Sequence, residues 1–456
     1  MFSLDDTIAA IATPPGAGGV GIIKISGTEA LSIAHKIFVP RSGSTELKPR
    51  YLHFGRIIEP VDRQPIDEAL VAFMPGPHSY TRQDVIEIQA HGGTIPLQQI
   101  LQVILSLGAR PAEAGEMTLR AFINGRLDLT QAEAVLDIIH AKTEAGLRIA
   151  AGQLAGSLSG QVSQVRQQLV DTLAFLEASI DFVEEDIPFE EVIGPLKAAL
   201  GEITQLLNTA SHGLIYRQGV RAAIVGRPNV GKSSLLNALL RGERAIVTNI
   251  PGTTRDTLEE TANIGGIPLV LVDTAGIRTE PSDAVEQIGI DRSRAALAQA
   301  DLALMVVDNS EALSDSDREI AALIGRKPAL LILNKVDLPQ NETPDKAFLP
   351  DSPRVPLSAL TGAGLDQLES IIVEQVAGGR VITPDAPIVS NPRHKALLTQ
   401  AVGHVRNAIE AQQSGLSPDL VSIDVREAVD ALGEITGETA TEDLLNTIFS
   451  RFCIGK

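Results

Sequence analysis

The chain has 456 residues, of which 44% are hydrophobic, so it is long enough for roughly two to four domains with sizeable cores. Its formal net charge is −19, from 38 Lys and Arg against 57 Asp and Glu, and the acidic excess is spread along the chain. This balance excludes a domain with the basic excess typical of nucleic-acid-binding modules. Any RNA partner therefore needs a local basic patch or a second protein.

The sequence predicts a cytoplasmic protein that does not associate with membranes. No stretch approaches the run of about 18 apolar residues that a membrane-spanning helix needs. The N-terminal MFSLDDTIAA carries acidic residues where a signal peptide carries basic ones. Cys453 is the only cysteine, which rules out an internal disulfide and suits a reducing compartment.

Residues 1–118 are predicted to form an α+β domain. The stretches DTIAAIAT, GVGIIKIS, AFMPG and DVIEIQAHGG are strand-like, and a helix is expected from Pro96 to Leu107. The turn at residues 14–21 contains G-x-G-x-x-G, which resembles a dinucleotide-binding fingerprint. That fingerprint needs a helix after the glycines, whereas residues 20–25 alternate like a strand. We therefore expect a hairpin or a ligand-covering loop.

Residues 119–216 change to helical periodicity. The stretch FVEEDIPFEE, residues 182–191, interrupts this pattern and predicts an acidic, solvated connection between two long helices. The apolar residues at steps of three and four that predict these helices are Val165, Leu169, Leu173, Leu176 and Ile180, followed by Leu196, Leu200, Ile203 and Leu207.

Residues 217–377 are predicted to form a separate α/β unit. The runs AAIV, PLVLVD, LALMVVD and ALLILN recur between helical stretches and fit parallel strands that are buried on both faces. A Gly- and Pro-rich linker follows, and helices return in residues 388–450, where Asp424 is the expected N-cap of one of them. Because helices bracket the α/β unit, we expect it to be inserted into a discontinuous helical domain.

The stretch AAIVGRPNVGKSS, residues 222–234, contains G-x-x-x-x-G-K-S between a strand and a helix. In this context Gly226 and Gly231 allow backbone N–H groups to turn toward phosphate oxygens, and the helix N-terminus attracts anions. Lys232 can reach the outer phosphates, and the Ser233 hydroxyl can ligate Mg²⁺. The pattern therefore predicts a phosphate-binding loop.

Further nucleotide-binding motifs follow in order. They are TTRD at residues 253–256, DTAG at 273–276, NKVD at 334–337 and SAL at 358–360. The Asp337 carboxylate can accept hydrogen bonds from N1–H and the 2-amino group of guanine, which adenine does not offer. Five motifs in this order resemble a GTPase domain, so we expect GTP rather than ATP.

The position after DTAG is unusual for a signalling GTPase. There a Gln orients the attacking water, but here the residue is Ile277, whose side chain cannot form a hydrogen bond. Glu286 is a candidate for ordering the water, although spacing alone favours an ordinary surface carboxylate. Positive charge at the transition state could come from a monovalent cation beside Asn229 or from Arg255, and the sequence does not separate the two.

Beyond these motifs the whole chain resembles the tRNA modification GTPase MnmE (TrmE) family. The resemblance is carried by ATPPGAGGVGIIKISG, MPGPHSYTRQDVIEIQAHGG, ARPAEAGEMTLRAFINGRLDLTQAEAV, the GTPase motifs and the C-terminal FCIGK. It implies an α+β N-terminal domain over residues 1–118 and a discontinuous helical domain over 119–216 and 378–456. It also implies an inserted α/β Ras-like P-loop GTPase domain over 217–377.

The resemblance also implies the residues of the GTPase site. Mg²⁺ would bind Ser233 and Thr254, K⁺ would bind Asn229, Thr248, Thr253 and the backbone oxygen of Ile250, and Glu286 would order the attacking water, with Lys232 as the second catalytic residue. One extra residue precedes Glu286 relative to some members. The expected GTP-binding residues are Asn229, Val230, Gly231, Lys232, Ser233, Ser234, Thr248, Asn249, Ile250, Pro251, Gly252, Thr253, Thr254, Asp273, Thr274, Ala275, Gly276, Asn334, Lys335, Asp337, Ser358, Ala359 and Leu360.

For the N-terminal domain, the resemblance implies dimerisation and a site for a 5-formyl- or 5,10-methylene-tetrahydrofolate. The matching residues are Lys24, Glu87, Arg126 and Lys456. Family members often have Arg at the first position and Lys at the third, so the charge is kept while a bidentate contact can change. Cys453 is a candidate catalytic thiol, although the sequence favours a buried structural or an incidental cysteine.

The family acts with the FAD-dependent protein MnmG (GidA) to place a (carboxymethyl)aminomethyl group at C5 of the wobble uridine of certain tRNAs. We therefore expect a homodimer that binds MnmG and tRNA and uses GTP, Mg²⁺, K⁺ and folate. One alternative is a GTP-dependent RNA or ribosome assembly factor without modification chemistry. Another is a regulatory switch that only recruits an effector.

Overall fold

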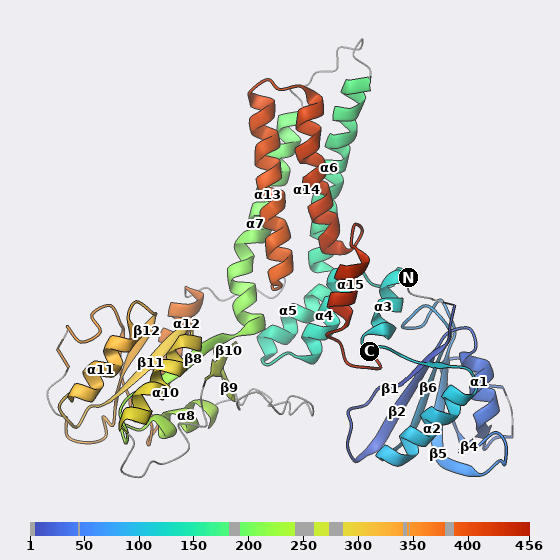
Figure 1. The fold of residues 1–456 in the computed structure, drawn as a ribbon, viewed down its shortest axis with the longest axis horizontal. Coiled ribbons are helices and arrows are strands. Elements are labelled where there is room, and N and C mark those ends of the chain that lie inside the picture. Colours follow the sequence, from blue (N-terminus) through green and yellow to red (C-terminus); the bar gives the residue numbers. More distant parts are fainter. Residues whose placement is uncertain are drawn as a thin grey trace. The chain divides into compact units, whose positions relative to one another are not determined.

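The computed structural model describes residues 5–43, 46–181, 192–241, 260–272, 286–340, 344–345, 347–378 and 387–456, with the side chains of 181, 241, 286–290 and 292 left out (Figure 1). The chain divides into two compact units. The first comprises Met1–Leu136, Ser159–Ile187 and Ser417–Lys456, and the second comprises Asp137–Leu158 and Pro188–Leu416.

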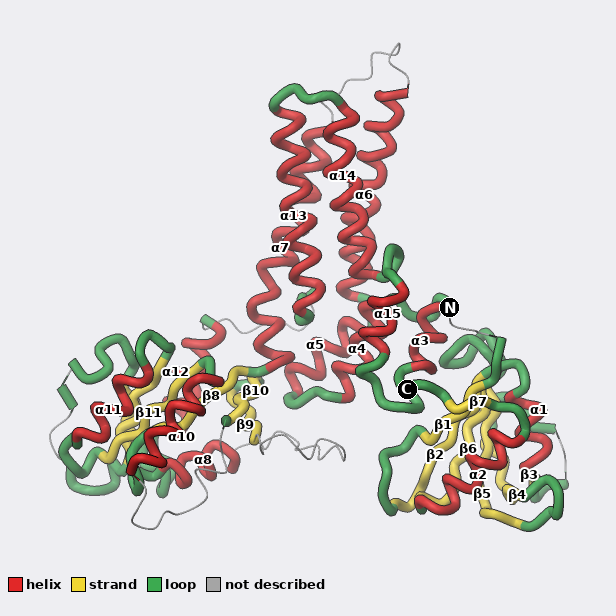
Figure 2. Tube along the Cα trace, viewed as in Figure 1, coloured by secondary structure: helices red, strands yellow, loops and turns green. Residues whose placement is uncertain are grey.

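A seven-stranded sheet in the first unit has the order β3-β4-β5-β6-β2-β1-β7 (Figure 2). The region expected to form a hairpin does so, because β1 pairs antiparallel with β2 and no helix follows the glycines. The strands are β1 (Ile8–Ile11), β2 (Gly18–Ser26), β3 (Phe38–Pro40), β4 (Leu52–Ile58), β5 (Pro65–Met74), β6 (Val85–Gly92) and β7 (Arg110–Pro111).

Helices α1 (Ala30–Ile37) and α2 (Thr94–Ser106) cover one face of this sheet. Alternate strand residues such as Ile23 and Ile88 point to that face and join a core with the helices. The expected helix at 96–107 is therefore confirmed, with its start two residues earlier. The intervening strand residues, Lys24 among them, point to the opposite face because side chains alternate along a strand.

Helices α3 (Glu116–Ile123) and α15 (Glu442–Phe449) pack together in the first unit. Phe449 contacts Phe122 and Phe452, with ring centroids 6.4 and 5.4 Å apart. The last residues of the chain then approach the N-terminal sheet region, where Ile454 forms a bridge with Ala114. The two ends of the sequence thus belong to one folded unit.

The long helices α6 (Ser157–Asp181) and α14 (Pro418–Thr436) lie side by side (Figure 1). Arg426 on α14 pairs with Glu177 on α6 at 2.6 Å. The prediction that Asp424 caps a helix is wrong, because α14 begins at Pro418 with Ser417 as its N-cap. Proline at the first helical position has no N–H to leave unsatisfied, so the helix starts there and Asp424 lies in its interior.

In the second unit, helices α7 (Ile193–Gln218) and α13 (Pro392–Gln413) pack against each other although the whole α/β region separates them in the sequence. Gly213 on α7 allows the residues just before α13 to approach closely, since a Cβ there would lie 2.2 Å from the Val389 carbonyl oxygen. This pairing supports insertion of the α/β region into a helical domain. Helices α4 (Leu129–Ile139) and α5 (Glu144–Leu154) precede this pair in the chain.

The α/β region has a six-stranded sheet in the order β13-β12-β11-β8-β10-β9. The four apolar runs form the buried parallel strands that were predicted, and an antiparallel edge strand, β9, adjoins β10. The strands are β8 (Val220–Val225), β9 (Glu260–Ile264), β10 (Ile267–Leu271), β11 (Leu302–Asp308), β12 (Ala329–Asn334) and β13 (Arg354–Pro356), and the helices are α8 (Lys232–Arg241), α10 (Glu286–Gln299), α11 (Asp315–Ile324) and α12 (Leu365–Ala377).

Within the described residues, no helix combines the length and the apolar character that crossing a membrane requires.

A charged network fastens α3 to the start of β1. Arg120, with only 1% of its side chain exposed, pairs with Asp6 at 2.5 Å and with Glu116 at 2.9 Å, and Arg110 also contacts both carboxylates. Burial by itself would raise the pKa of Asp6 and of Glu116, but the two arginines lower both pKa values overall. The stabilisation is therefore complete above the unfolded pKa values near 4 and is lost as the pH falls through the folded ones.

We expect Arg120→Met to destabilise the local structure by about 3–5 kcal/mol, because it breaks the buried ion pair with Glu116 and leaves Arg110 as the cation beside that carboxylate. Hydrogen exchange followed by mass spectrometry should then show the amides of α3 exchanging roughly 100-fold faster or more at pH 7. The difference from the unmodified chain should shrink as the pH approaches 3. Arg148→Gln, which removes an exposed pair with Glu144, is the control. Unchanged α3 exchange in Arg120→Met would contradict the assignment.

Candidate functional site

The phosphate loop follows the central strand β8 and has a backbone that most side chains would not permit. Gly226 and Gly231 have φ values of +149° and +98°, and Asn229 has +64°. A Cβ at Gly226 would lie 2.3 Å from the Val306 carbonyl oxygen, and one at Gly231 would lie 2.1 Å from Asn334 Nδ2. Glycine is therefore required at both positions, and the loop leads directly into the N-terminus of α8.

Backbone carbonyl groups of the phosphate loop hold the Lys232 side chain in place. Its Nζ donates to the carbonyl oxygens of Gly226 at 2.8 Å and Arg227 at 2.7 Å. The pKa of Lys232 is lowered to about 8, because the effect of burial outweighs the opposing negative charge of nearby Asp317. An ammonium group fixed at a helix N-terminus beside inward-turning N–H groups suits phosphate oxygens. The geometry therefore fits the phosphate end of a nucleotide.

Asn334 joins the phosphate loop to the loops expected at the base. Its buried Nδ2 donates to the Val230 carbonyl oxygen at 2.7 Å, and its Oδ1 accepts from Ala359 N–H at 3.0 Å. Ser358 is fully buried and its Oγ accepts from Thr361 N–H at 3.2 Å. These bonds bring three motifs to one edge of the sheet, as expected for parallel strands that end together.

The exposed side chains at this edge are the ones predicted to meet a ligand. Asn229, Ser233, Ser234 and Asp337 are exposed, and Leu360 is 82% exposed. The side chains that shape the loops are buried, while these exposed ones can reach a ligand. The arrangement can bind a nucleotide with its phosphates at α8 and its base near the NKVD loop.

A second cluster lies on the face of the N-terminal sheet that α1 and α2 leave uncovered. Lys24 on β2 and Glu87 on β6 are directly opposite each other in the register, and Gln89 donates to Glu87 Oε1 at 2.8 Å. Burial, and next the positive charge of nearby Lys456, lower the pKa of Lys24, while Glu87 opposes them. The C-terminal residue is thus brought to the Lys24–Glu87 pair.

Comparison with known proteins identifies the family. The model described as "MnmE helical domain" matches residues 129–453, and "GTP-binding protein TrmE N-terminus" matches residues 7–126. Proteins named "tRNA modification GTPase MnmE" from Roseiflexus sp. (strain RS-1), Chloroflexus aurantiacus and Moorella thermoacetica are 50%, 51% and 49% identical. Each alignment covers 99% of this chain and 99–100% of the relative. The chain belongs to the tRNA modification GTPase MnmE family. The resemblance seen in the sequence is confirmed, as is the multidomain fold.

Within this family fold, part of the predicted site lies outside the described residues. The structure places Asn229 to Ser234, the NKVD motif and the SAL motif at one edge of the sheet. Arg255, Ile277 and the side chain of Glu286 are not described, so their roles stay predictions. The same holds for Thr248, Asn249, Ile250, Pro251, Gly252, Thr253, Thr254, Asp273, Thr274, Ala275 and Gly276.

The metal-binding predictions can be compared only with the residues near α8. Among the residues that the structure describes, no three His, Cys, Asp or Glu side chains lie close enough to hold a metal ion. The exposed Ser233 hydroxyl at the start of α8 offers an oxygen atom, the type of ligand that Mg²⁺ prefers. Asn229, in its left-handed conformation, presents an exposed amide in the loop. Both residues fit the expected ions, and the complete ligand sets stay predictions.

The folate residues are only partly brought together. Lys24, Glu87 and Lys456 form one cluster, but the contact found for Arg126 is with Tyr80, whose ring centroid lies 4.6 Å from the guanidinium carbon. Cys453 is exposed and free, close in sequence to this cluster. The strand pattern around Lys24 does not indicate that this side chain lies close to Lys456.

Sequence reasoning missed two ion pairs beside the phosphate and base loops. Asp308 pairs with Lys335 at 2.6 Å, and Arg227 pairs with Glu311. The only available signal for Asp308 was its position at the end of a buried strand, LALMVVD, where neighbouring strands carry the nucleotide motifs.

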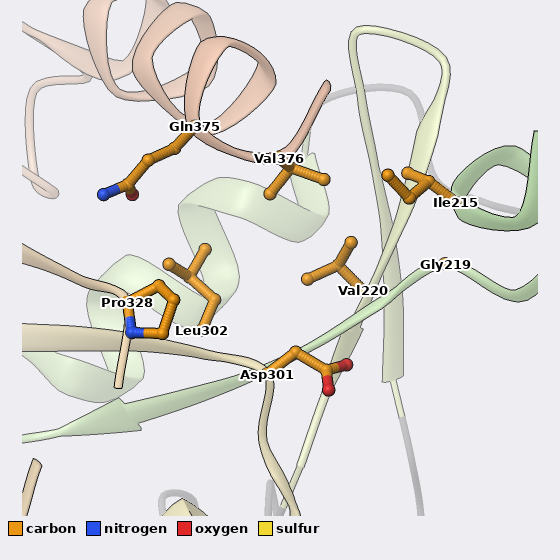
Figure 3. Close-up of a pocket in the computed structure, with 8 residues that line it drawn as sticks. All are labelled: Ile215, Gly219, Val220, Asp301, Leu302, Pro328, Gln375 and Val376. Carbon is orange, nitrogen blue, oxygen red and sulfur yellow. The ribbon is translucent and has the colours of Figure 1, made fainter. Parts of the chain in front are cut away.

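A pocket of about 280 Å³ lies elsewhere in the α/β region (Figure 3). Val220, at the start of β8, and Leu302, at the start of β11, both line it, so it is at the opposite ends of these strands from the phosphate loop. Asp301 is an acidic residue that also lines this pocket. This pocket is not the nucleotide site.

We expect nucleotide affinity to depend on the protonation of Lys232. With a pKa of about 8 in the free protein, the phosphate-binding ammonium form falls about tenfold between pH 7 and pH 9. The affinity for GDP should therefore weaken by about the same factor over this range, as measured by titration with a fluorescent GDP analogue. Lys232→Arg, which stays charged, is the control and should bind with a flat profile. A flat profile for the unmodified chain would contradict the prediction.

Proposed function

We propose that this protein hydrolyses GTP in the modification of the wobble uridine of certain tRNAs, together with the FAD-dependent partner MnmG. The observation that carries the proposal is the full-length identity of about half with proteins named tRNA modification GTPase MnmE. The joined phosphate and base loops add support, because Asn334 connects them in a geometry that suits a nucleotide. The modification places a (carboxymethyl)aminomethyl group at C5.

GTP binding follows from the proposed roles of the two loops. The phosphate loop receives the phosphates with the Lys232 ammonium, and Asp337 accepts from the guanine edge. Ser233 and Thr254 hold Mg²⁺, which neutralises phosphate charge when bound. Asn229, Thr248, Ile250 and Thr253 hold K⁺. Glu286 orders the attacking water in place of the glutamine that Ile277 replaces.

The N-terminal sheet is the proposed site for a tetrahydrofolate derivative. Lys24 and Lys456 attract the carboxylates of the folate tail, while Glu87 can accept from the N–H edge of the pterin. Arg126 completes the site from the segment after α3. Bound folate supplies the one-carbon unit. Cys453 is the proposed catalytic thiol.

We propose that these roles belong to separate domains. Residues 1–118 bind folate and dimerise, 119–216 with 378–456 form the helical domain, and 217–377 hydrolyse GTP. We propose that two GTPase domains meet in a K⁺-dependent contact, and that the protein works in the cytoplasm. Since the chain carries a net charge of −19, we assign most of the tRNA contact to the partner MnmG.

The cation proposal predicts that GTP turnover is much faster in K⁺ than in Na⁺ at equal ionic strength. The physical reason is that a cation of fitting size supplies the positive charge that an arginine finger supplies elsewhere, worth a factor of about 10³ or more. Glu286→Ala should lower kcat by about 100-fold with GDP affinity unchanged. Steady-state phosphate release measures the turnover in the two salts and the kcat of the variant. Titration with a fluorescent GDP analogue measures the GDP affinity of the variant. Equal turnover in the two salts rules out the cation site.

The modification proposal predicts that tRNA from a strain lacking this chain carries unmodified wobble uridine. Nucleoside mass spectrometry measures this directly, and reintroducing the chain should restore the modified nucleoside. The alternative, a GTP-dependent RNA or ribosome assembly factor, predicts intact modification. Calorimetry with 5-formyltetrahydrofolate separates the two further, since the assembly factor should give no heat with or without GTP.

A further inference from the structure

Asp308 ends β11 with a buried carboxylate that belongs to none of the GTPase motifs. Its side chain is 4% exposed, and its two oxygens have different partners. Oδ1 accepts from Ser310 N–H at 2.9 Å and from Ser310 Oγ at 2.6 Å, and Oδ2 lies 2.6 Å from Lys335 Nζ. Burial by itself would raise the pKa of Asp308, but the bonds from Lys335 and Ser310 lower it overall, so the group is charged at neutral pH.

Lys335, the partner of Asp308, has a strained backbone in the middle of the base motif. Its φ of +67° is unusual for a residue with a side chain, and such a conformation persists only where the surroundings hold it. The buried Asn334 directly precedes Lys335 in the chain. The exposed Asp337, which faces guanine in the proposed site, follows Lys335 by two residues. The Leu338 N–H donates to the Lys335 carbonyl oxygen at 3.0 Å and closes the turn.

The segment that starts at Asp308 also contacts the phosphate loop. Arg227 pairs with Glu311 through Nη2, and its Nε lies 3.4 Å from Oδ2 of Asp317. Asp317 is buried with 2% of its side chain exposed, and its Oδ2 accepts from the N–H of Ser314, the N-cap of α11, at 2.9 Å. One segment between β11 and α11 therefore contacts both ends of the nucleotide site, and Asp308 is its contact with the base end.

We propose that Asp308 is a positioning residue for guanine nucleotides, which acts through Lys335 and does not touch the nucleotide. By holding the Lys335 ammonium against the end of β11, it keeps the strained turn in the shape that directs Asp337 toward the base. This inference rests on the proposed function, since it assumes that the NKVD loop binds guanine. A purely structural Asp308 would stabilise the end of β11 without regard to Lys335.

The test is a double-mutant cycle in the full-length chain, read as affinity for a fluorescent GDP analogue. Asp308→Asn keeps the shape and the acceptor for Ser310 but removes the charge. We expect it to weaken GDP binding by about tenfold, as for loss of a charge-assisted hydrogen bond, and to raise KM for GTP with kcat unchanged. Added to Lys335→Met, it should cost no further affinity, because the two act as one unit.

Asp315→Asn is the matched control, because Asp315 is 95% exposed at the start of α11 and its ion-pair partner, Arg318, lies three residues away on the same helix. Unchanged GDP affinity in Asp308→Asn overturns the proposal. The proposal is also overturned if Asp308→Asn costs the same affinity in the unmodified chain as in the chain that already carries Lys335→Met.

A second pair of variants covers the case in which Asp308→Asn does not fold. Lys335→Arg keeps a cation for Asp308 and should retain GDP affinity within about threefold, whereas Lys335→Met should lose about tenfold. Equal losses from the two overturn the proposal. An unmodified chain that fails to bind GDP refutes the proposed function itself, whereas normal binding in the unmodified chain and in Asp308→Asn refutes only the role of Asp308.

Discussion

The nucleotide site depends on one buried carboxamide. Asn334 cannot be buried without partners for its donors and its acceptor, because unsatisfied polar groups are costly in the interior. It finds them in the Val230 carbonyl oxygen and the Ala359 N–H, which lie 104 and 25 residues away in the sequence. The phosphate loop and the loop after β13 are thereby held to the end of β12. The shape of the site follows from satisfying this single side chain.

The parallel sheet makes this arrangement possible. Strands β11 and β12 are buried along their whole length, and β8 is buried except at Arg221. Their backbone groups must therefore pair with neighbouring strands until the strands end. Their carboxyl ends therefore release the phosphate loop, Asp308 and Asn334 at the same edge. Close packing then restricts the loops, and glycine is needed where Val306 and Asn334 press against them.

The N-terminal sheet uses the two-residue period of strands for a different purpose. One face is apolar and covered by α1 and α2, and the other carries Lys24 opposite Glu87. The end of the chain adds Lys456 to this second face. Gly455 allows that approach, since its φ is +88° and a Cβ would lie 2.8 Å from the Ala12 Cα. A charged cluster thus forms from the beginning and the end of the sequence.

The sequence alone determined the features that depend on local pattern. Apolar runs predicted the buried strands, steps of three and four predicted α6 and α7, and the order of motifs predicted the GTPase unit. The N-terminal and C-terminal signatures carried the specific resemblance to the family. Local pattern was misleading at Asp424, where a capping signature lies inside α14 because Pro418 starts the helix earlier. Only the tertiary structure decided that Asn334 lies between two loops and that Asp308 lies against Lys335. The reason is physical, since burial and charge pairing act through space, and the spacing of residues along the chain does not record them.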